Sequence, residues 1–224
     1  MIRNTYVVKF FKFTDKIVTK KRDEIMLKIR ENINIRNLNT ILDVGTTDDD
    51  SLSSSNYIIY KFGDIKSKKS ISNQKIYNKF FDINYEKSIT EKLSEKELNI
   101  LSSDIVISSA TIEHVGNDYN KIMMIKNMGL LAKKYFVITT PNRFYPIDFH
   151  TKLPFIHFLP KNIHRAILKL IGMEFFSKEE NLDLISYKQL KILLKNVENF
   201  QIQIKRIKFF GLTSNFIVIA KKVL

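Results

Sequence analysis

The residues best suited to acid–base chemistry are two histidines that each lie close to an acidic residue. His114 follows Glu113 directly, and His150 comes two residues after Asp148. A neutral imidazole can accept a proton near neutral pH, so either histidine could serve as a general base. We predict that His150 is the base, that Asp148 or another carboxylate orients its ring, and that His114 is the alternative base. The competing interpretation of His150 is a loop histidine that only stabilises packing.

A metal site is a second chemistry that histidine spacing can indicate. His150, His157 and His164 are seven residues apart, which would align them on one face of a continuous helix. Pro154 and Pro160 interrupt that stretch, and proline ends or kinks a helix. We therefore predict no metal site.

The elements that must position these residues alternate between strands and helices. The predicted strands cover residues 40–44, 76–81, 104–109 and 135–140, and residues 201–209 and 215–221 are predicted to form a hairpin. The predicted helices cover residues 21–33, 57–62, 118–131 and 161–171, with Asn117 or Asp118 as the cap of the third. Another begins at Ser186, where Gln189 three residues later completes a capping-box pattern. This alternation predicts an α/β fold with a mostly parallel sheet, helices on both faces and an antiparallel C-terminal hairpin.

In such sheets, ligands bind at the carboxyl ends of the strands. The segments at those positions are DVGTT (43–47), Asp82 with Ile83, SSATIEHVG (108–116) and TTPNRFYPIDFHT (139–151). Gly45 follows a buried strand, where a missing side chain lets the backbone turn tightly and approach a ligand. These four segments are therefore the candidate site.

The order and spacing of these segments resemble the Rossmann-like class I S-adenosylmethionine (SAM)-dependent methyltransferases, above all the small-molecule branch with a Glu-His-Val signature after the fourth strand. The resemblance runs from about residue 38 to the C-terminus and implies a doubly wound, seven-stranded sheet. It implies that the first segment lines the methionine part of the cofactor and that Asp82 binds the adenine. The implied cofactor-binding residues are Asp43, Val44, Gly45, Thr46, Asp82, Ile83, Ser109, Ala110 and Glu113.

The sequence departs from that family pattern in two places. Thr47 and Asp49 occupy the later glycine positions of the first loop. Residues 71–76 lie where the second strand should end, and they include no carboxylate to bind the ribose; Asp64 comes too early. These departures favour the alternative that the chain is a degenerate, non-catalytic methyltransferase fold acting as a binding module.

Composition limits the remaining classes. With 224 residues and no cysteine, the chain is expected to form a single domain without disulfides or cysteine–metal sites. We expect a helical cover over residues 1–37, a cofactor-binding half over 38–140, and an acceptor loop with helices and hairpin over 141–224. The net charge of +14 raises an RNA-binding or RNA-modifying alternative, but the basic residues are scattered, so a nucleic-acid partner is disfavoured.

The combined prediction is a cytoplasmic SAM-dependent methyltransferase. Its acceptor is expected to be a small molecule, a sugar or a lipid-linked glycan, methylated at oxygen. The apolar run 153–159 either lines the acceptor pocket, packs as buried core or touches a membrane surface transiently together with Lys152, Lys161 and Arg165. No stretch is long and apolar enough to predict a membrane span.

Overall fold

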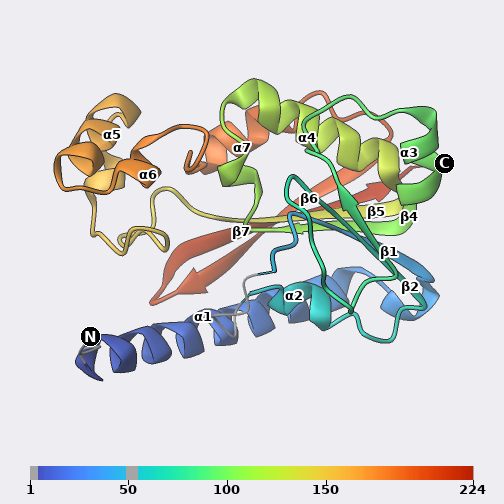
Figure 1. Ribbon diagram of the computed structural model, residues 1–224, viewed down its shortest axis with the longest axis horizontal. Helices are drawn as coiled ribbons and strands as arrows, with labels where there is room; N and C mark the ends of the chain where they lie inside the picture. The colour runs from blue at the N-terminus through green and yellow to red at the C-terminus, as the bar shows by residue number, and fades with distance from the viewer. Residues whose placement is uncertain (1–4, 49–54, 224) are drawn as a thin grey trace.

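A twisted β-sheet forms the centre of the molecule (Figure 1). The computed structural model describes residues 5–48 and 55–223, with side chains from residue 18 onward, and within this part seven strands pair in the order β3-β2-β1-β4-β5-β7-β6. They are β1 (Thr40–Val44), β2 (Ser67–Ser72), β3 (Ile83–Glu86), β4 (Ser103–Ser109), β5 (Ala132–Pro141), β6 (Phe200–Phe209) and β7 (Leu212–Lys222). The first five are parallel, and β7 runs antiparallel to both β5 and β6. The predicted doubly wound topology with an antiparallel C-terminal hairpin is confirmed.

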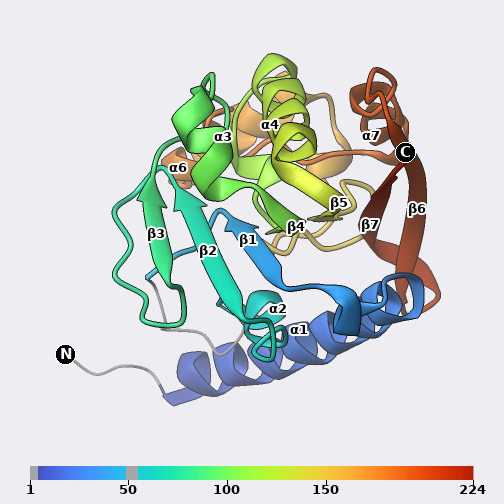
Figure 2. The same cartoon turned by 90° about the vertical axis from the view of Figure 1, so that its right-hand side faces the viewer.

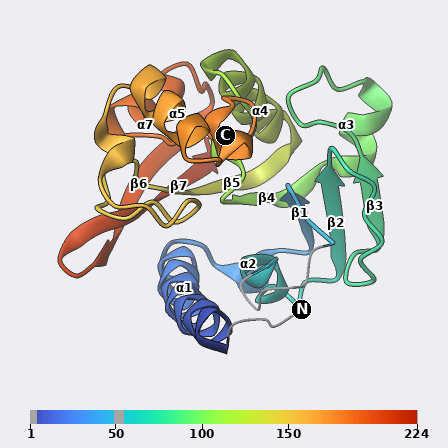
Figure 3. The same ribbon diagram turned by 60° about the vertical axis from the view of Figure 1, so that its left-hand side comes forward.

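Helices cover both faces of the sheet (Figure 3). One face carries α1 (Thr5–Asn32) and α2 (Tyr57–Tyr60); the other carries α3 (Glu95–Leu101), α4 (Asp118–Leu131) and α7 (Tyr187–Leu193). Neighbouring strand residues point to opposite faces, so Ile41 packs in the core under α1, and Leu42 packs in the core under α4. Because both faces are covered, β1 and β4 consist almost entirely of buried residues, as their apolar runs predict.

A lobe of loops and short helices stands beyond the sheet, on the left in Figure 1. It includes the loop that follows β5, the short helix η3 (Ile156–Phe158), α5 (Lys161–Leu170) and α6 (Glu174–Ser177). The chain enters it from the carboxyl end of β5, so the lobe adjoins the edge of the sheet where ligands are expected. Among the described helices, none has the length and apolar character to cross a membrane.

Two predicted helix starts are present. The Asn117 side chain accepts a hydrogen bond from the backbone N–H of Asn120 (3.0 Å) and caps α4. Ser186 caps α7 by accepting from the N–H of Gln189 (3.2 Å). The Gln189 side chain donates to Asp118 instead (2.7 Å), so only half of the predicted capping box forms.

The second and third strands are not where the sequence predicts them. Residues 76–81 form no strand, whereas the polar segment SKKSIS forms β2, and β3 begins at Ile83 (Figure 2). The charged Lys69 fits within the sheet because its ammonium group donates to the carbonyl oxygens of Ile100 (2.6 Å) and Ser102 (3.1 Å). The alternation of apolar and polar residues does not predict such a strand, because its polar groups are satisfied by residues distant in the sequence.

Candidate functional site

A cavity of about 180 Å³ opens at the carboxyl ends of β1 and β4. Five of the predicted cofactor-binding residues line it: Asp43, Val44, Gly45, Ser109 and Ala110. The remaining wall comes from α1, α2 and the residues just before α2, with Arg22, Asn56 and Tyr57 among the lining side chains. The two strand ends predicted to bind a cofactor therefore share one cavity.

The turn after β1, which includes Gly45, lines this cavity. Gly45 has φ +91°, a conformation that L side chains rarely adopt, and its N–H donates to the carbonyl oxygen of Ile71 (2.9 Å). A β-carbon at this position would lie 2.3 Å from Oγ1 of Thr111, so the glycine is required by packing as well as by conformation. The sequence suggested a close approach to a ligand; the structure adds a close approach to the loop after β4.

Asp43 is a buried acid facing the same cavity. Burial raises its pKa from 3.8 to about 7, and the hydrogen bond from the Thr46 hydroxyl opposes that shift. Thr46 therefore acts through Asp43, and it is not among the residues that line the cavity. The Asp43 carboxyl group is poised to change charge near neutral pH.

The end of β4 adopts a sparsely populated backbone conformation. Ala110 has φ +56°, and its N–H donates to the carbonyl oxygen of Thr139 on β5 (2.9 Å). The Thr111 hydroxyl donates to the carbonyl oxygen of Val44 (3.2 Å), which ties this turn to the end of β1. Strained residues held by several hydrogen bonds are common in ligand sites.

The structure does not place Asp82 and Ile83 at the candidate site. Asp82 precedes β3, and its carboxylate accepts from the N–H of Lys68 (2.8 Å) near the amino end of β2. Ile83 is the first residue of β3 and pairs with Lys69. The predicted position of Asp82 at the end of a strand is therefore wrong, because β3 begins after it. Glu86 is the acid at the carboxyl end of β3.

Glu113, His114 and His150 form a second group of polar side chains near this edge. Glu113 and His114 belong to the short helix η2 (Ile112–His114) after β4, and His150 comes from the loop after β5. Glu113 is fully buried, and its Oε2 accepts a hydrogen bond from the Thr140 hydroxyl (2.9 Å). Its Oε1 lies 3.5 Å from Nε2 of His150, and the two histidine rings meet edge to face at 4.7 Å.

The electrostatics of this group favour a charged carboxylate. Burial raises the pKa of Glu113, but the facing His150 and the positive charge on either histidine outweigh it, so the net pKa is lowered. Burial lowers the pKa of His114, although the charge of Glu113 opposes that shift. A deprotonated glutamate beside a predominantly neutral His114 is the arrangement that results at neutral pH.

Asp148 has a different role from the one predicted. Its carboxylate accepts from the backbone N–H groups of His150 (3.0 Å) and Thr151 (3.2 Å), and from the Thr151 hydroxyl (2.6 Å). It therefore shapes the loop that carries His150, whereas the carboxylate that faces the His150 ring belongs to Glu113.

The other two histidines lie elsewhere. Nε2 of the buried His157 is 2.7 Å from the carbonyl oxygen of Tyr145, which assigns it to packing. His164 lies beside His157, with ring centroids 6.3 Å apart. The seven-residue spacing therefore does not bring the three histidines together.

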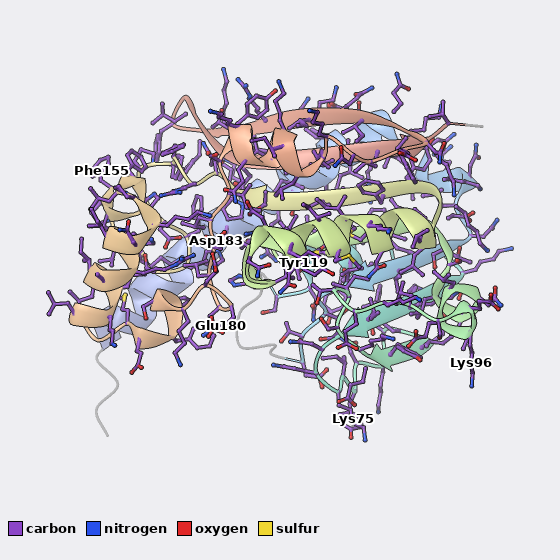
Figure 4. All side chains as sticks on the ribbon, turned by 90° about the horizontal axis from the view of Figure 1, so that it is seen from above. Lys75, Lys96, Tyr119, Phe155, Glu180 and Asp183 are labelled. Atoms are coloured by element: carbon purple, nitrogen blue, oxygen red, sulfur yellow. The ribbon has the colours of Figure 1, made fainter. Side chains whose placement is uncertain are left out.

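Asp183 joins the lobe to the body of the protein (Figure 4). Its carboxylate binds Lys121 of α4 (2.5 Å) and Lys161 (2.7 Å) and Arg165 (3.0 Å) of α5, and its N–H donates to the carbonyl oxygen of Glu113 (2.7 Å). Lys161 and Arg165, which the sequence offered as membrane contacts in one of three alternatives, both form ion pairs with the buried Asp183. The network holds η2 against the lobe.

Removing the charge of Asp183 should destabilise the fold. Asp183→Asn leaves Lys121, which is fully buried, without a buried counter-ion, so we expect unfolding free energy to fall by about 3 kcal/mol. Glu179→Gln is the matched control, because Glu179 is 42% exposed and pairs with the same Arg165; its loss should be below about 1 kcal/mol. Urea unfolding measures both, and equal losses would contradict the role of Asp183.

The cavity residues outside the strand ends, such as Arg22 and Asn56, were not predicted from the sequence. Arg22 comes from α1, and its distance along the chain gives no signal of its place. Asn56 adopts a left-handed conformation (φ 50°), and its side chain bonds both the N–H (3.2 Å) and the carbonyl oxygen (2.6 Å) of Thr47. Asn is one of the few residues that tolerate this conformation, a weak local signal. Asp49 lies outside the described residues.

Solved structures share this fold, whereas no family model matches the sequence and no curated protein matches it significantly. Magnesium protoporphyrin IX methyltransferase from Synechocystis PCC 6803, solved with bound S-adenosylhomocysteine (SAH), matches 91% of this chain and 83% of its own, with a TM-score of 0.51 and 11% identity. A cyclopropane-fatty-acyl-phospholipid synthase-like protein from Lactobacillus casei ATCC 334 matches 92% of both chains, with a TM-score of 0.56 and 8% identity.

A third solved structure is an O-methyltransferase family protein from Burkholderia thailandensis. It matches 95% of this chain and 59% of its own, with a TM-score of 0.54 and 9% identity. Together with the strand order and the antiparallel hairpin, these matches show that the chain has the Rossmann-like fold of the class I SAM-dependent methyltransferases.

Proposed function

We propose that this protein is a SAM-dependent methyltransferase that modifies an oxygen atom of a small-molecule, sugar or lipid-linked acceptor. The observation that carries the proposal is the cavity at the ends of β1 and β4, in a chain with the methyltransferase fold. The polar group of Glu113, His114 and His150 supports it, because it adjoins this edge of the sheet.

The cavity residues suit the methionine end of the cofactor. Gly45 and Ala110 present backbone without bulky side chains, and Asp43 offers a carboxylate for a positively charged group. At the ribose end, β2 stops at Ser72 and is followed by Asn73 and Gln74, so neutral polar groups stand where a carboxylate is usual. We infer that the ribose is bound through these side chains or by Glu86 at the end of β3.

The bound cofactor supplies the activated methyl group, and the protein must position the acceptor oxygen in line with it. The acceptor hydroxyl also has to lose its proton. Glu113, His114 and His150 can support that loss, and Asp148 positions the loop that carries His150.

An exposed aromatic cluster in the lobe that follows β5 supports a sugar or lipid-linked acceptor. Phe144, Phe155 and Phe158 are exposed and contact one another through their rings (Phe155 is labelled in Figure 4). Exposed aromatic faces bind the apolar faces of sugars and acyl chains by burying area from water.

Titration calorimetry with SAM and SAH tests the proposal. We expect one site per chain for each ligand. No heat with either ligand would contradict the enzyme function and favour the binding-module alternative, which the neutral residues after β2 support.

Asp43 makes binding depend on pH. The positive sulfonium of SAM favours the ionised carboxylate, so SAM affinity should rise as pH increases from about 6 to about 8, by at most tenfold per pH unit. SAH carries a neutral sulfur and should show a smaller dependence. Asp43→Asn should remove the difference between the two ligands; a difference that persists would show that another group titrates.

A further inference from the structure

Two buried polar atoms in the Glu113–His150 pair have no hydrogen-bond partner. They are Oε1 of Glu113 and Nε2 of His150, which lie 3.5 Å apart. The Glu113 side chain is 0% exposed to solvent, and none of the described lysines and arginines forms an ion pair with it. A buried carboxylate oxygen without a donor needs a positive partner to offset its lost hydration.

The neighbouring contacts leave a ring nitrogen of His114 free to accept an ion. His114 Nδ1 lies 2.6 Å from the carbonyl oxygen of Asn181, and since a carbonyl only accepts, Nδ1 carries the proton and Nε2 keeps its lone pair. The ligand atoms of Glu113, His114 and His150 all lie within 4.8 Å of one another. Ligand atoms bound at about 2.1 Å to one ion lie at most about 4.2 Å apart, so small side-chain rotations would bring these three atoms into contact with one ion.

A second layer of contacts holds the three side chains in place. The Thr140 hydroxyl occupies the other oxygen of Glu113, and the carbonyl oxygen of Asn181 orients the ring of His114. Asp148 fixes the backbone of His150 (3.0 Å). Hydrogen bonds of this kind, from the non-ligating atoms of ligand side chains, are typical of metal sites.

We propose that Glu113, His114 and His150 bind a divalent first-row transition-metal ion whose open coordination positions take the acceptor oxygen. Two imidazoles and one carboxylate suit Mn²⁺, Fe²⁺ or Zn²⁺ better than Mg²⁺, which prefers oxygen ligands and water. The use of the ion in catalysis rests on the proposed methyltransferase function, whereas its binding does not.

The ion would act on the acceptor by weakening the O–H bond of a coordinated hydroxyl. The hydroxyl proton leaves to water, the oxygen forms a bond to the methyl carbon, and the carbon–sulfur bond of the cofactor breaks. The products are the methyl ether, neutral SAH and a proton. His150 then serves as a ligand of the ion, and water accepts the hydroxyl proton in place of the His150 ring, which the sequence predicted as the general base.

Metal binding can be measured without an acceptor. Protein stripped with a chelator is dialysed against MnCl₂ or ZnCl₂ alone, and bound metal is counted by mass spectrometry. We expect one ion per chain, lost in His150→Ala and in Glu113→Gln. Thr140→Val, which removes only an outer contact, should weaken binding by about 10–100-fold.

His164→Ala is the matched control, because His164 is a buried histidine with an unpartnered Nε2 outside this group. It should bind metal as the unmodified protein does. His150 is partly exposed (18%), so its replacement tests the site even if Glu113→Gln fails to fold. Absence of stoichiometric binding, or binding unchanged in His150→Ala, would overturn the inference.

SAH calorimetry on the same samples separates the two proposals. SAH binding without metal binding would refute the metal site and leave the methyltransferase function standing. Metal binding without SAH binding would refute the methyltransferase function and leave the metal site standing.

Discussion

Gly45→Val is expected to abolish binding of both SAM and SAH. The new β-carbon would lie 2.3 Å from Oγ1 and 2.4 Å from Cγ2 of Thr111, so the loop after β4 must move. That loop includes Ala110, which lines the same cavity as Gly45. The clash therefore alters both walls of the cavity, and titration calorimetry should detect no binding.

The control for this variant is Gly172→Val. Gly172 also has a positive φ (+80°), but a β-carbon there meets nothing within 4 Å. Both variants should lose about 1–2 kcal/mol of stability from the unfavourable backbone conformation. Only Gly45→Val should lose cofactor binding; loss in both, or in neither, would mean that this turn does not form the cofactor site.

His150→Ala is expected to lower methyl transfer by about 10²–10⁴-fold while leaving SAH affinity nearly unchanged, because it removes the general base or, when the proposed ion is bound, one of its ligands. His150 faces Glu113 in the acceptor-side group, and it is not among the residues lining the cofactor cavity. Turnover is measured as SAH formation, with sugar and lipid extracts as the source of acceptor. A loss of SAH affinity would assign His150 to loop packing.

The control for His150 must come from an exposed position in the same loop. His157→Ala is unsuitable, because His157 is 1% exposed and contacts the carbonyl oxygen of Tyr145, so its loss should destabilise the protein. Ile147→Ala is suitable, because Ile147 is 47% exposed. Equal losses of turnover in Ile147→Ala and His150→Ala would contradict a specific role for His150.

The sequence by itself determined the elements whose signals are local. The apolar run of β1 stops at a glycine, β4 and β5 are short buried runs, and Asn117 caps α4. Burial on both faces of a parallel sheet requires such runs, and a cap acts within one helical turn, so neighbouring residues suffice to predict these elements.

Only the tertiary structure decided β2, β3 and the pairing of the polar side chains. β2 is polar, and Lys69 is satisfied by carbonyl groups about thirty residues away. The carboxylate facing His150 belongs to Glu113, on another strand's loop, whereas the nearer Asp148 bonds the backbone. Contacts between distant segments depend on how strands are ordered in the sheet, and no local pattern specifies that order.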